Sequence, residues 1–310
     1  MAILLDIRLP DWNAEADVRK ELASRLPGVP IYCGIDEAQA DVRMAAVIVL
    51  HPGVARKLPR LKLVQKLGAG VEGIVRDPEL PSDVRITRFS SSIQAESIAS
   101  YCVAQVLRAV WEIERYRFAE GNCRWQPGPP RWNAEPVVGV LGLGRIGSVV
   151  AKRFSSLGLK VIGWSISKKS IQGVECRNSP ESLRGLLGEC DCIACVLPST
   201  PETRSLFCSE TLSMMKAGSL LINVGRGDLI DEKSLVEALE RDRPSEAVLD
   251  VLPEEPLPAS SMLWNNERVF VTPHVSGWKM DDVVPLIAEN YNRLMAGRPL
   301  LNEIDRAAGY

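Results

Sequence analysis

Residues 137–147, VVGVLGLGRIG, decide the fold of this 310-residue chain. The stretch begins as an apolar strand and continues into Gly142-Leu143-Gly144-Arg145-Ile146-Gly147, the spacing of the dinucleotide-binding fingerprint. A helical apolar stripe follows, formed by Ile146, Val149, Val150, Phe154 and Leu157. In such a unit the first glycine allows a tight turn, the second lets a pyrophosphate approach the backbone, and the third lets helix and strand pack closely. The stretch therefore predicts a doubly wound domain whose helix N-terminus binds dinucleotide phosphates.

Apolar segments alternate with amphipathic ones over most of the chain, which is typical of parallel sheets with helical crossovers. The pattern predicts strands at 3–5, 30–33, 46–50, 62–67 and 84–87, and later at 137–141, 160–164, 192–197, 220–224, 247–252 and 269–272. It predicts helices at 14–26, 94–119 and 281–294, and a loop at the proline-rich run 125–132. The chain is therefore an α/β protein, and it changes domain where a new strand follows this loop.

The composition excludes several classes of protein. Lys and Arg number 37 against 39 Asp and Glu, and this balance argues against a nucleic-acid-binding protein or a polybasic membrane anchor. The apolar run 45–50 is far shorter than the roughly 18 residues that a membrane helix needs, and residues 1–10 contain no basic leader with a cleavage site. We expect a cytoplasmic protein that binds neither nucleic acid nor membrane.

The chain has eight cysteines, of which only Cys190, Cys192 and Cys195 lie close together in sequence. A metal site would need a second cluster or a nearby histidine, and the sequence offers neither. On the expected strand, Cys192 and Cys195 point to opposite faces of the sheet. We interpret these cysteines as free thiols of the core and expect no metal site.

The end of the second strand of the dinucleotide-binding domain helps to decide between the nicotinamide cofactors. An NAD site usually places an acidic residue there for the ribose hydroxyls. The segment Ser165-Ile166-Ser167-Lys168-Lys169 has hydroxyls and cations instead, which suit an adenosine 2′-phosphate. The alternative interpretation is a solvated basic turn. The segment favours NADP(H), and NAD(H) stays possible.

Three charged side chains, Arg226, Glu255 and His274, each follow one of the later strands. Open α/β sheets bind ligands at the carboxyl ends of their strands. The planar fork of an Arg can bind a carboxylate through two bonds, and a Glu beside an imidazole stabilises the imidazolium that can protonate a carbonyl. Each of the three could instead belong to a surface ion pair. The second histidine, His51, is interpreted as structural or as adjacent to the substrate.

Taken together, these features resemble the D-2-hydroxyacid dehydrogenase family over essentially the whole chain. The segments that carry the resemblance are 67–74, 125–127, 142–147, 199–203, 225–227, 255–258, 272–274 and 304–310. Within the family, the motifs are most similar to those of the glyoxylate/hydroxypyruvate reductases.

The resemblance implies two Rossmann- or flavodoxin-like domains with parallel sheets and an active site in the cleft between them. Residues 1–93 and 278–310 would form the substrate domain, and residues 94–277 the dinucleotide-binding domain. Arg226 would hold the carboxylate and the carbonyl oxygen of the substrate, His274 would donate the proton, and Glu255 would orient and charge His274.

The resemblance also implies a set of binding residues. Backbone amides of Ala69, Gly70 and Val71 would bind the far carboxylate oxygens, a role that suits a glycine-rich loop. Trp125 would help to close the substrate pocket, either in its own subunit or in the neighbouring subunit of a homodimer. The cofactor would contact Gly142, Gly144, Arg145, Ile146, Gly147, Ser165, Ser167, Lys168, Leu197, Pro198, Thr203, Val224, Asp250 and Ser276, with Asp250 at the nicotinamide carboxamide.

Three positions depart from the family pattern. Related reductases often have Arg where Ile166 stands, which weakens the argument for NADP(H). Many members have Glu at the position of Ser100 and Phe at the position of Leu252, and these changes affect local packing rather than chemistry.

The predicted function is NAD(P)H-dependent reduction of small 2-oxo acids, such as glyoxylate and hydroxypyruvate, to glycolate and D-glycerate. One alternative is a D-2-hydroxyacid dehydrogenase that acts on a larger 2-oxo acid. Another is a nicotinamide-sensing binding protein on the same fold.

Overall fold

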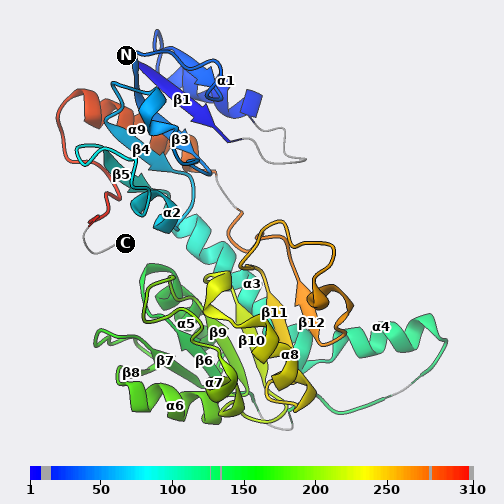
Figure 1. The fold of residues 1–310 in the computed structure, drawn as a ribbon. Helices are drawn as coiled ribbons and strands as arrows, with labels where there is room; N and C mark the ends of the chain where they lie inside the picture. The colour runs from blue at the N-terminus through cyan, green and yellow to red at the C-terminus, as the bar shows by residue number, and fades with distance from the viewer. Residues whose placement is uncertain (8–14, 126, 133–134, 279–280, 307–310) are drawn as a thin grey trace. The chain divides into compact units, whose positions relative to one another are not determined.

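The computed structural model describes residues 1–7, 15–125, 127–132, 135–278 and 281–306. It divides into two compact units, each built on one parallel sheet (Figure 1). Unit 1 comprises Met1–Ile93 and Met280–Tyr310, and unit 2 comprises Gln94–Lys279. The α/β class with two parallel-sheet domains is confirmed.

Unit 1 contains a five-stranded sheet in the order β2-β1-β3-β4-β5, in which all neighbouring strands are parallel. Its strands are β1 (Ala2–Asp6), β2 (Ile31–Cys33), β3 (Val42–Val47), β4 (Leu63–Lys66) and β5 (Arg85–Arg88), and its helices are α1 (Glu15–Arg25), α2 (Glu72–Val75) and α9 (Val283–Met295), with a 3-10 turn at Ala55–Lys57. This strand order is the flavodoxin-like one. Residue 14, the predicted start of the first helix, lies outside the described residues.

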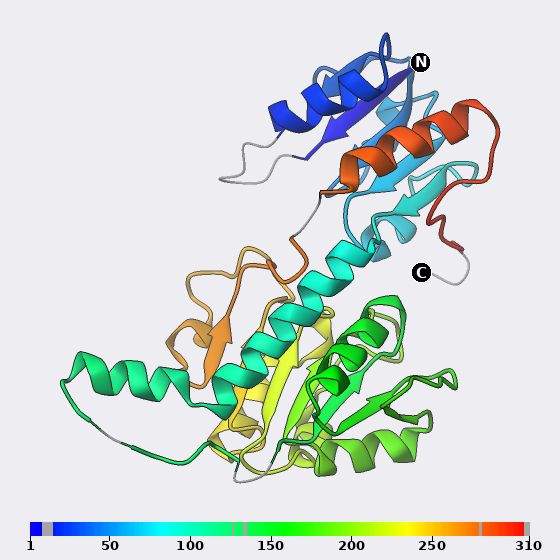
Figure 2. The same cartoon turned by 180° about the vertical axis from the view of Figure 1, so that it is seen from behind.

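Helix α9 joins the C-terminal segment to the rest of unit 1. Figure 2 shows α1 and α9 on the same face of the sheet, and their apolar side chains share one core with strands β1, β3 and β4. The fully buried Asn290 donates to Gln65 Oε1 (2.7 Å), and its amide group exchanges two hydrogen bonds with the backbone of Leu301 (3.1 and 2.8 Å). Thr87 Oγ1 donates to the same Gln65 oxygen (2.7 Å). Apolar packing and buried hydrogen bonds together hold the C-terminal segment against the sheet of unit 1.

Unit 2 contains a seven-stranded parallel sheet in the order β12-β11-β10-β9-β6-β7-β8. Its strands are β6 (Val138–Leu141), β7 (Val161–Trp164), β8 (Glu175–Arg177), β9 (Cys192–Cys195), β10 (Leu220–Asn223), β11 (Glu246–Leu249) and β12 (Val269–Val271). Its helices are α3 (Ser92–Val110), α4 (Ile113–Gly121), α5 (Arg145–Ser156), α6 (Pro180–Glu189), α7 (Ser209–Ser213) and α8 (Glu232–Glu240), with 3-10 turns at Gly227–Leu229 and Met262–Asn265. Counted from β6, this is the Rossmann order, and the order reverses between β6 and β9. In the described ranges, no helix is both long enough and apolar enough to cross a membrane.

Helices cover both faces of this second sheet: α3 and α5 lie on one face, and α6, α7 and α8 lie on the other (Figures 1 and 2). Cys192 belongs to the core under α3 and α5, whereas Cys195 belongs to the opposite core, so their predicted orientations are confirmed. Burial raises the pKa of Cys195 to about 12, and the thiol therefore stays protonated at neutral pH. Within the described ranges, no group of three or more His, Cys, Asp or Glu side chains could hold a metal ion.

Three predicted elements differ from the structure by more than two residues. Strand β11 ends at Leu249 and not at the predicted 252, because its partners β10 and β12 end at Asn223 and Val271, opposite Leu249. Strand β3 begins four residues and ends three residues before the predicted 46–50, because its pairing partners β1 and β4 end at Asp6 and Lys66, opposite Val47. The apolar run continues past that point although the sheet does not. The predicted helix 94–119 is two helices, α3 and α4, because the chain turns at Glu112, whose φ is 47°. The described residues of the run 125–132 form neither helix nor strand, as predicted.

Candidate active site

The three charged residues of the predicted catalytic set follow neighbouring parallel strands of unit 2. Arg226 comes after β10, Glu255 after β11, and His274 after β12. Because these strands are adjacent and parallel, their carboxyl ends lie along one edge of the sheet, where open α/β sheets bind ligands. The fold thus brings to one edge three residues that are far apart in sequence.

A direct hydrogen bond joins two of the three residues. His274 Nδ1 lies 2.8 Å from Glu255 Oε2, and Glu255 Oε1 accepts a hydrogen bond from the backbone amide of Leu252 (2.9 Å). The side chains of His274 and Glu255 are 53% and 39% exposed, so solvent or a substrate can reach them. With Nδ1 occupied by the carboxylate, Nε2 is the imidazole nitrogen available to an incoming ligand.

The electrostatic surroundings of Glu255 keep this carboxylate ionised. Partial desolvation raises its pKa, but the hydrogen bond and charge of His274, the amide of Leu252 and the charge of Arg226 outweigh that effect. The net result is a pKa below the ordinary value of 4.5. Glu255 is therefore an anion at neutral pH, and an anion beside the imidazole stabilises its protonated form.

The backbone around Arg226 is held by side-chain and packing contacts. The buried Asn223 side chain donates to Arg226 O (2.8 Å) and accepts from the amide of Gly225 (3.1 Å). A β-carbon at Gly227 would lie 1.9 Å from the carbonyl carbon of Leu252, so only glycine lets the two loops approach so closely. The guanidinium is half-buried, and its Nη1 donates to Gly225 O (2.5 Å). These contacts seat Arg226 beside the loop that carries Glu255.

Asp250 anchors the loop that carries His274. Its carboxylate is fully buried; Oδ1 accepts from Thr272 Oγ1 (2.6 Å) and the amide of Val275 (2.9 Å), and Oδ2 accepts from the amide of Ser276 (3.0 Å). A carboxylate has about four acceptor positions, so three bonds leave one on Oδ2 for a further donor. The structure thus gives Asp250 a role in positioning the loop, which the sequence did not predict; its predicted contact with a carboxamide stays a prediction.

The glycine-rich turn between β6 and α5 fits a dinucleotide. Gly142 has a φ of 98°, and a β-carbon at Gly147 would lie 1.7 Å from Gly142 O, so both positions require glycine. A β-carbon at Gly144 would meet nothing within 4 Å, which leaves room for a phosphate. Gly144 is also the N-cap of α5 and provides no side-chain cap for the helix amides. Such amides bind phosphate oxygens. Arg145 at the start of the helix is exposed, and Ile146 after it is half-buried.

The remaining predicted cofactor residues lie along the same edge of the sheet. Leu197, Pro198 and Thr203 follow β9, and the buried Thr203 donates to Pro198 O (2.6 Å). Ser165 follows β7, is buried, and donates to Ser167 O (2.7 Å), which fixes the turn. Ser167 and Lys168 are exposed, Val224 and Ser276 are buried, and Ile166 is 68% exposed.

The other predicted substrate-binding residues lie outside the group formed by the three charged residues in unit 2, or belong to unit 1. Trp125 lies in unit 2, but its side chain is 96% exposed and therefore packs against almost nothing of the described chain. Ala69, Gly70 and Val71 belong to unit 1, where they connect β4 to α2, and Arg88 Nη1 donates to Ala69 O (3.5 Å). His51 is also in unit 1, exposed, in the loop after β3. The cleft between the domains stays a prediction.

The structure adds residues that the sequence analysis did not assign a role. Asn223 holds the Arg226 turn, and Thr272 and Tyr101 extend the Asp250 network, with Tyr101 Oη 2.7 Å from Thr272 Oγ1. The segments 225–227 and 272–274 carry the family resemblance, but no local pattern assigns a role to the side chains of Asn223 and Thr272. Tyr101 lies 171 residues before Thr272, so nothing local in the sequence connects them.

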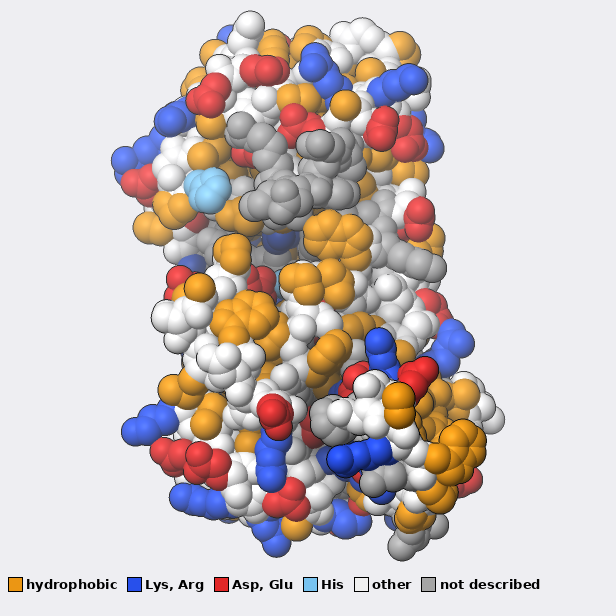
Figure 3. Space-filling model, turned by 90° about the vertical axis from the view of Figure 1, so that its right-hand side faces the viewer, with side chains coloured by type: hydrophobic (Ala, Val, Ile, Leu, Met, Phe, Trp, Pro, Cys, Tyr) orange, Lys and Arg blue, Asp and Glu red, His pale blue; other side chains and the backbone are white. Residues whose placement is uncertain are grey.

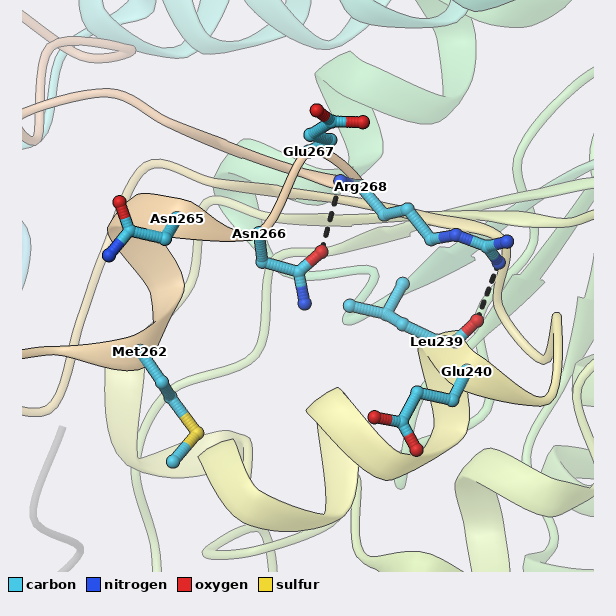
Figure 4. Close-up of a pocket in the computed structure, with 7 residues that line it drawn as sticks. All are labelled: Leu239, Glu240, Met262, Asn265, Asn266, Glu267 and Arg268. Atoms are coloured by element: carbon cyan, nitrogen blue, oxygen red, sulfur yellow. Dashed lines mark hydrogen bonds between the residues drawn. The ribbon is translucent and has the colours of Figure 1, made fainter.

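A surface hollow elsewhere in unit 2 is a weaker candidate (Figure 4). It is lined by Leu239, Glu240, Met262, Asn265, Asn266, Glu267 and Arg268. These residues end α8 or precede β12, so they lie near the amino ends of the strands, away from the catalytic set. Its one cation, Arg268, already donates to Leu239 O (2.6 Å). The hollow offers no arrangement of groups for the chemistry of an active site.

Comparisons with known proteins point to one family. Residues 103–276 match the family model described as "D-isomer specific 2-hydroxyacid dehydrogenase, NAD binding domain". The chain is 34% identical over 285 residues to glyoxylate/hydroxypyruvate reductase A of Escherichia fergusonii, and the match covers 90% of each protein.

Solved structures of similar proteins share the fold over the full length. A D-isomer specific 2-hydroxyacid dehydrogenase from Xanthobacter autotrophicus Py2, in complex with NADPH and MES, is 36% identical with a TM-score of 0.89 and 100% coverage of both chains. An NADPH-dependent glyoxylate/hydroxypyruvate reductase from Sinorhizobium meliloti, in complex with NADP and sulfate, is 28% identical with a TM-score of 0.90, covering 100% of this chain and 99% of that one.

Proposed function

Because this chain belongs to the D-isomer specific 2-hydroxyacid dehydrogenase family, whose members are NAD(P)-dependent oxidoreductases, we propose that it reduces small 2-oxo acids such as glyoxylate and hydroxypyruvate. The products are the 2-hydroxy acids glycolate and D-glycerate. The observation that carries the proposal is the 2.8 Å contact between His274 Nδ1 and Glu255 Oε2, at the sheet edge that also carries Arg226. This arrangement provides a proton donor, a group that charges it, and a cation for a carboxylate.

The residues divide the reaction between them. Arg226 binds the carboxylate of the 2-oxo acid and stabilises the negative charge that develops on its carbonyl oxygen. His274 Nε2 donates a proton to that oxygen, and Glu255 orients the ring through Nδ1 and stabilises the imidazolium. The nicotinamide, when bound, supplies the hydride to the carbonyl carbon. In unit 1, the amides of Ala69, Gly70 and Val71 bind the far carboxylate oxygens.

The cofactor preference rests on the turn after β7. The Gly142–Gly147 turn and the amides that begin α5 would hold the pyrophosphate, and Asp250 would accept from the carboxamide of the nicotinamide. Ser165, Ser167 and Lys168 offer hydroxyls and a cation, with no acidic residue between 165 and 169, which suits the 2′-phosphate of NADP(H). The NADPH and NADP complexes of the two similar structures support this preference.

A homodimer, joined through its cofactor domains, is the proposed assembly. Unit 2 exposes several large apolar side chains in and beside α3 and α4: Leu107 (42%), Trp111 (55%), Ile113 (44%) and Trp125 (96%). In Figure 1, α4 extends to the right, and Figure 3 views the molecule from that side. Hydrophobic side chains gather at the lower right of this view. A second subunit would bury such a surface. Trp125, which contacts almost nothing of its own chain, would then complete the partner's pocket.

The cytoplasmic location stays a prediction.

Oxidation of NADPH and of NADH in the presence of glyoxylate, hydroxypyruvate, pyruvate and phenylpyruvate tests the proposal. We expect fast turnover of the first two acids with NADPH and slower turnover with NADH. Preferred turnover of phenylpyruvate would instead indicate a larger substrate. Cofactor binding without turnover of any acid would favour the nicotinamide-sensing alternative.

A further inference from the structure

The loop that carries His274 is tied to helix α3 by two hydroxyl groups. Tyr101 Oη lies 2.7 Å from Thr272 Oγ1, and Ser97 Oγ donates to Ser276 O (2.9 Å). Tyr101 and Ser97 are four residues apart and therefore lie on the same face of α3. Figure 2 shows α3 beside β12, the strand that leads into the loop. The helix thus contacts the loop on both sides of His274.

The hydrogen-bond partners determine which hydroxyl donates. Thr272 Oγ1 donates its single proton to Asp250 Oδ1, 2.6 Å away. Thr272 Oγ1 can then only accept from Tyr101, and Tyr101 is the donor. Desolvation raises the pKa of Tyr101 to about 12, so its hydroxyl keeps this proton at neutral pH. The bonds therefore run in one direction, from Tyr101 to Thr272 to Asp250.

These bonds act on a residue in an unfavourable backbone conformation. His274 has a φ of 56°, in the left-handed region that a residue with a β-carbon rarely adopts. Its amide donates to Thr272 O (2.9 Å), and the two amides that follow it, of Val275 and Ser276, both donate to Asp250. Thr272 on one side and Asp250 on the other therefore keep the imidazole in the position where Nδ1 reaches Glu255.

We propose that Tyr101 is a positioning residue for His274, acting through Thr272 and Asp250. Its hydroxyl fixes the Thr272 side chain, Thr272 and Asp250 fix the loop backbone, and the loop aims Nε2 at the substrate. The role in turnover rests on the proposed function, but the effect on the position of the imidazole does not. Because Tyr101 does not contact the Arg226 turn in any hydrogen bond among the described residues, substrate affinity should depend on it far less than the proton-transfer step does.

Four variants test the kinetic part. Tyr101→Phe removes only the hydroxyl, and loss of one neutral hydrogen bond should lower the single-turnover rate of NADPH oxidation by about threefold to tenfold. The KM for glyoxylate should change less than about twofold. Thr272→Val should lower the rate at least as much, and Thr272→Ser, which keeps the hydroxyl, should recover most of it. The double variant Tyr101→Phe/Thr272→Val should be no slower than Thr272→Val alone, because the two groups act in series.

Tyr291→Phe is the matched control. The Tyr291 hydroxyl donates to Met1 O (2.9 Å) in unit 1, so its removal should leave the single-turnover rate unchanged. Equal losses in Tyr101→Phe and Tyr291→Phe, or additive effects in the double variant, would overturn the proposal.

The chain has only two histidines, so an NMR spectrum of histidine-labelled protein reports on His274 directly. The ring signal that disappears in His274→Ala belongs to His274, and the other belongs to His51. Tyr101→Phe should shift the His274 signal and leave the His51 signal in place, whether or not the protein reduces glyoxylate. An unmoved His274 signal would refute the positioning role. A shifted signal in a protein without turnover would leave that role standing and refute the proposed reaction instead.

Discussion

Both units contain a network of buried polar groups, but the two networks end differently. In unit 1, Asn290, Gln65 and Thr87 are all fully buried and bond only to one another and to the backbone. In unit 2, the buried Asp250 holds a loop whose neighbouring side chain, His274, is 53% exposed. The closed network can only stabilise the fold, because no ligand reaches it. The open one can orient a group that meets a substrate. Changes in unit 1 should therefore alter stability, and changes in unit 2 should alter turnover.

The largest expected effect is on the exposed end of the network in unit 2. His274→Ala removes the proton donor and should lower kcat for glyoxylate reduction by about 10²–10⁴-fold. The melting temperature should change little, because the side chain is half exposed. NADPH-linked turnover and thermal unfolding of the same preparation check the two statements. Turnover close to that of the natural protein would remove His274 from the role of proton donor.

In unit 1, an effect of similar size in free energy is expected on the stability of the fold and not on turnover. Asn290→Leu leaves its partners on Leu301 and Gln65 unsatisfied in the core, and should lower the free energy of unfolding by about 3 kcal/mol. Urea unfolding measures this loss, and kcat of the folded variant should be unchanged. Asn292→Leu, at an exposed position of the same helix, is the control and should cost less than about 0.5 kcal/mol. A large loss of kcat in Asn290→Leu without loss of stability would break the comparison between the two networks.

A smaller effect is expected from the charge of Glu255. The lowered pKa of this carboxyl means that its charge is present at neutral pH and is lost only as the pH falls through that low value. Glu255→Gln removes the charge at every pH, so the imidazolium loses its stabilising anion. We expect about a tenfold lower reduction rate at pH 7. As the pH rises, the reduction rate of Glu255→Gln should begin to fall at a lower pH than that of the natural protein. Glu254→Gln, at the neighbouring exposed position, should leave the profile unchanged. Coincident pH–rate profiles for Glu255→Gln and the natural protein would contradict the role of Glu255.

The smallest effect is expected at the solvent-exposed turn after β7. Lys168 is exposed, so a contact with the 2′-phosphate is screened by water, and Lys168→Ala should raise the KM for NADPH by only about two- to fivefold. The KM for NADH should not change. Lys152→Ala, an exposed change on α5, serves as the control for a general charge effect. An equal rise for NADPH and NADH would show that Lys168 does not discriminate between the cofactors.

Local features of the sequence predicted much of the fold and part of the site. The glycines of the 142–147 turn could be assigned their roles from spacing alone, because a tight turn and a close approach each demand the absence of a β-carbon. The carboxyl ends of β10 and β12 could be anticipated to within one residue, because each strand is a short apolar run, whereas β11 ends three residues before the predicted 252. Because these strands are parallel neighbours, their carboxyl ends lie at one edge of the sheet. The residues that follow them, Arg226, Glu255 and His274, therefore lie at that edge.

Other features depended on long-range contacts. The bounds of β3 were wrong in the prediction, because pairing with β1 and β4, and not the length of the apolar run, ends the strand at Val47. The break at Glu112 was missed, because the helical apolar pattern continues across it.

The sequence by itself determined the α/β class, the cofactor turn and the identity of the charged residues, since these depend on neighbours within a few positions. Only the tertiary structure decided how His274 is held. Asp250 accepts hydrogen bonds from the Thr272 hydroxyl and from the amides of Val275 and Ser276. Tyr101, 171 residues before Thr272 in the sequence, forms a hydrogen bond with the Thr272 hydroxyl. No spacing rule relates residues so far apart, because their contact depends on how a helix packs against a sheet.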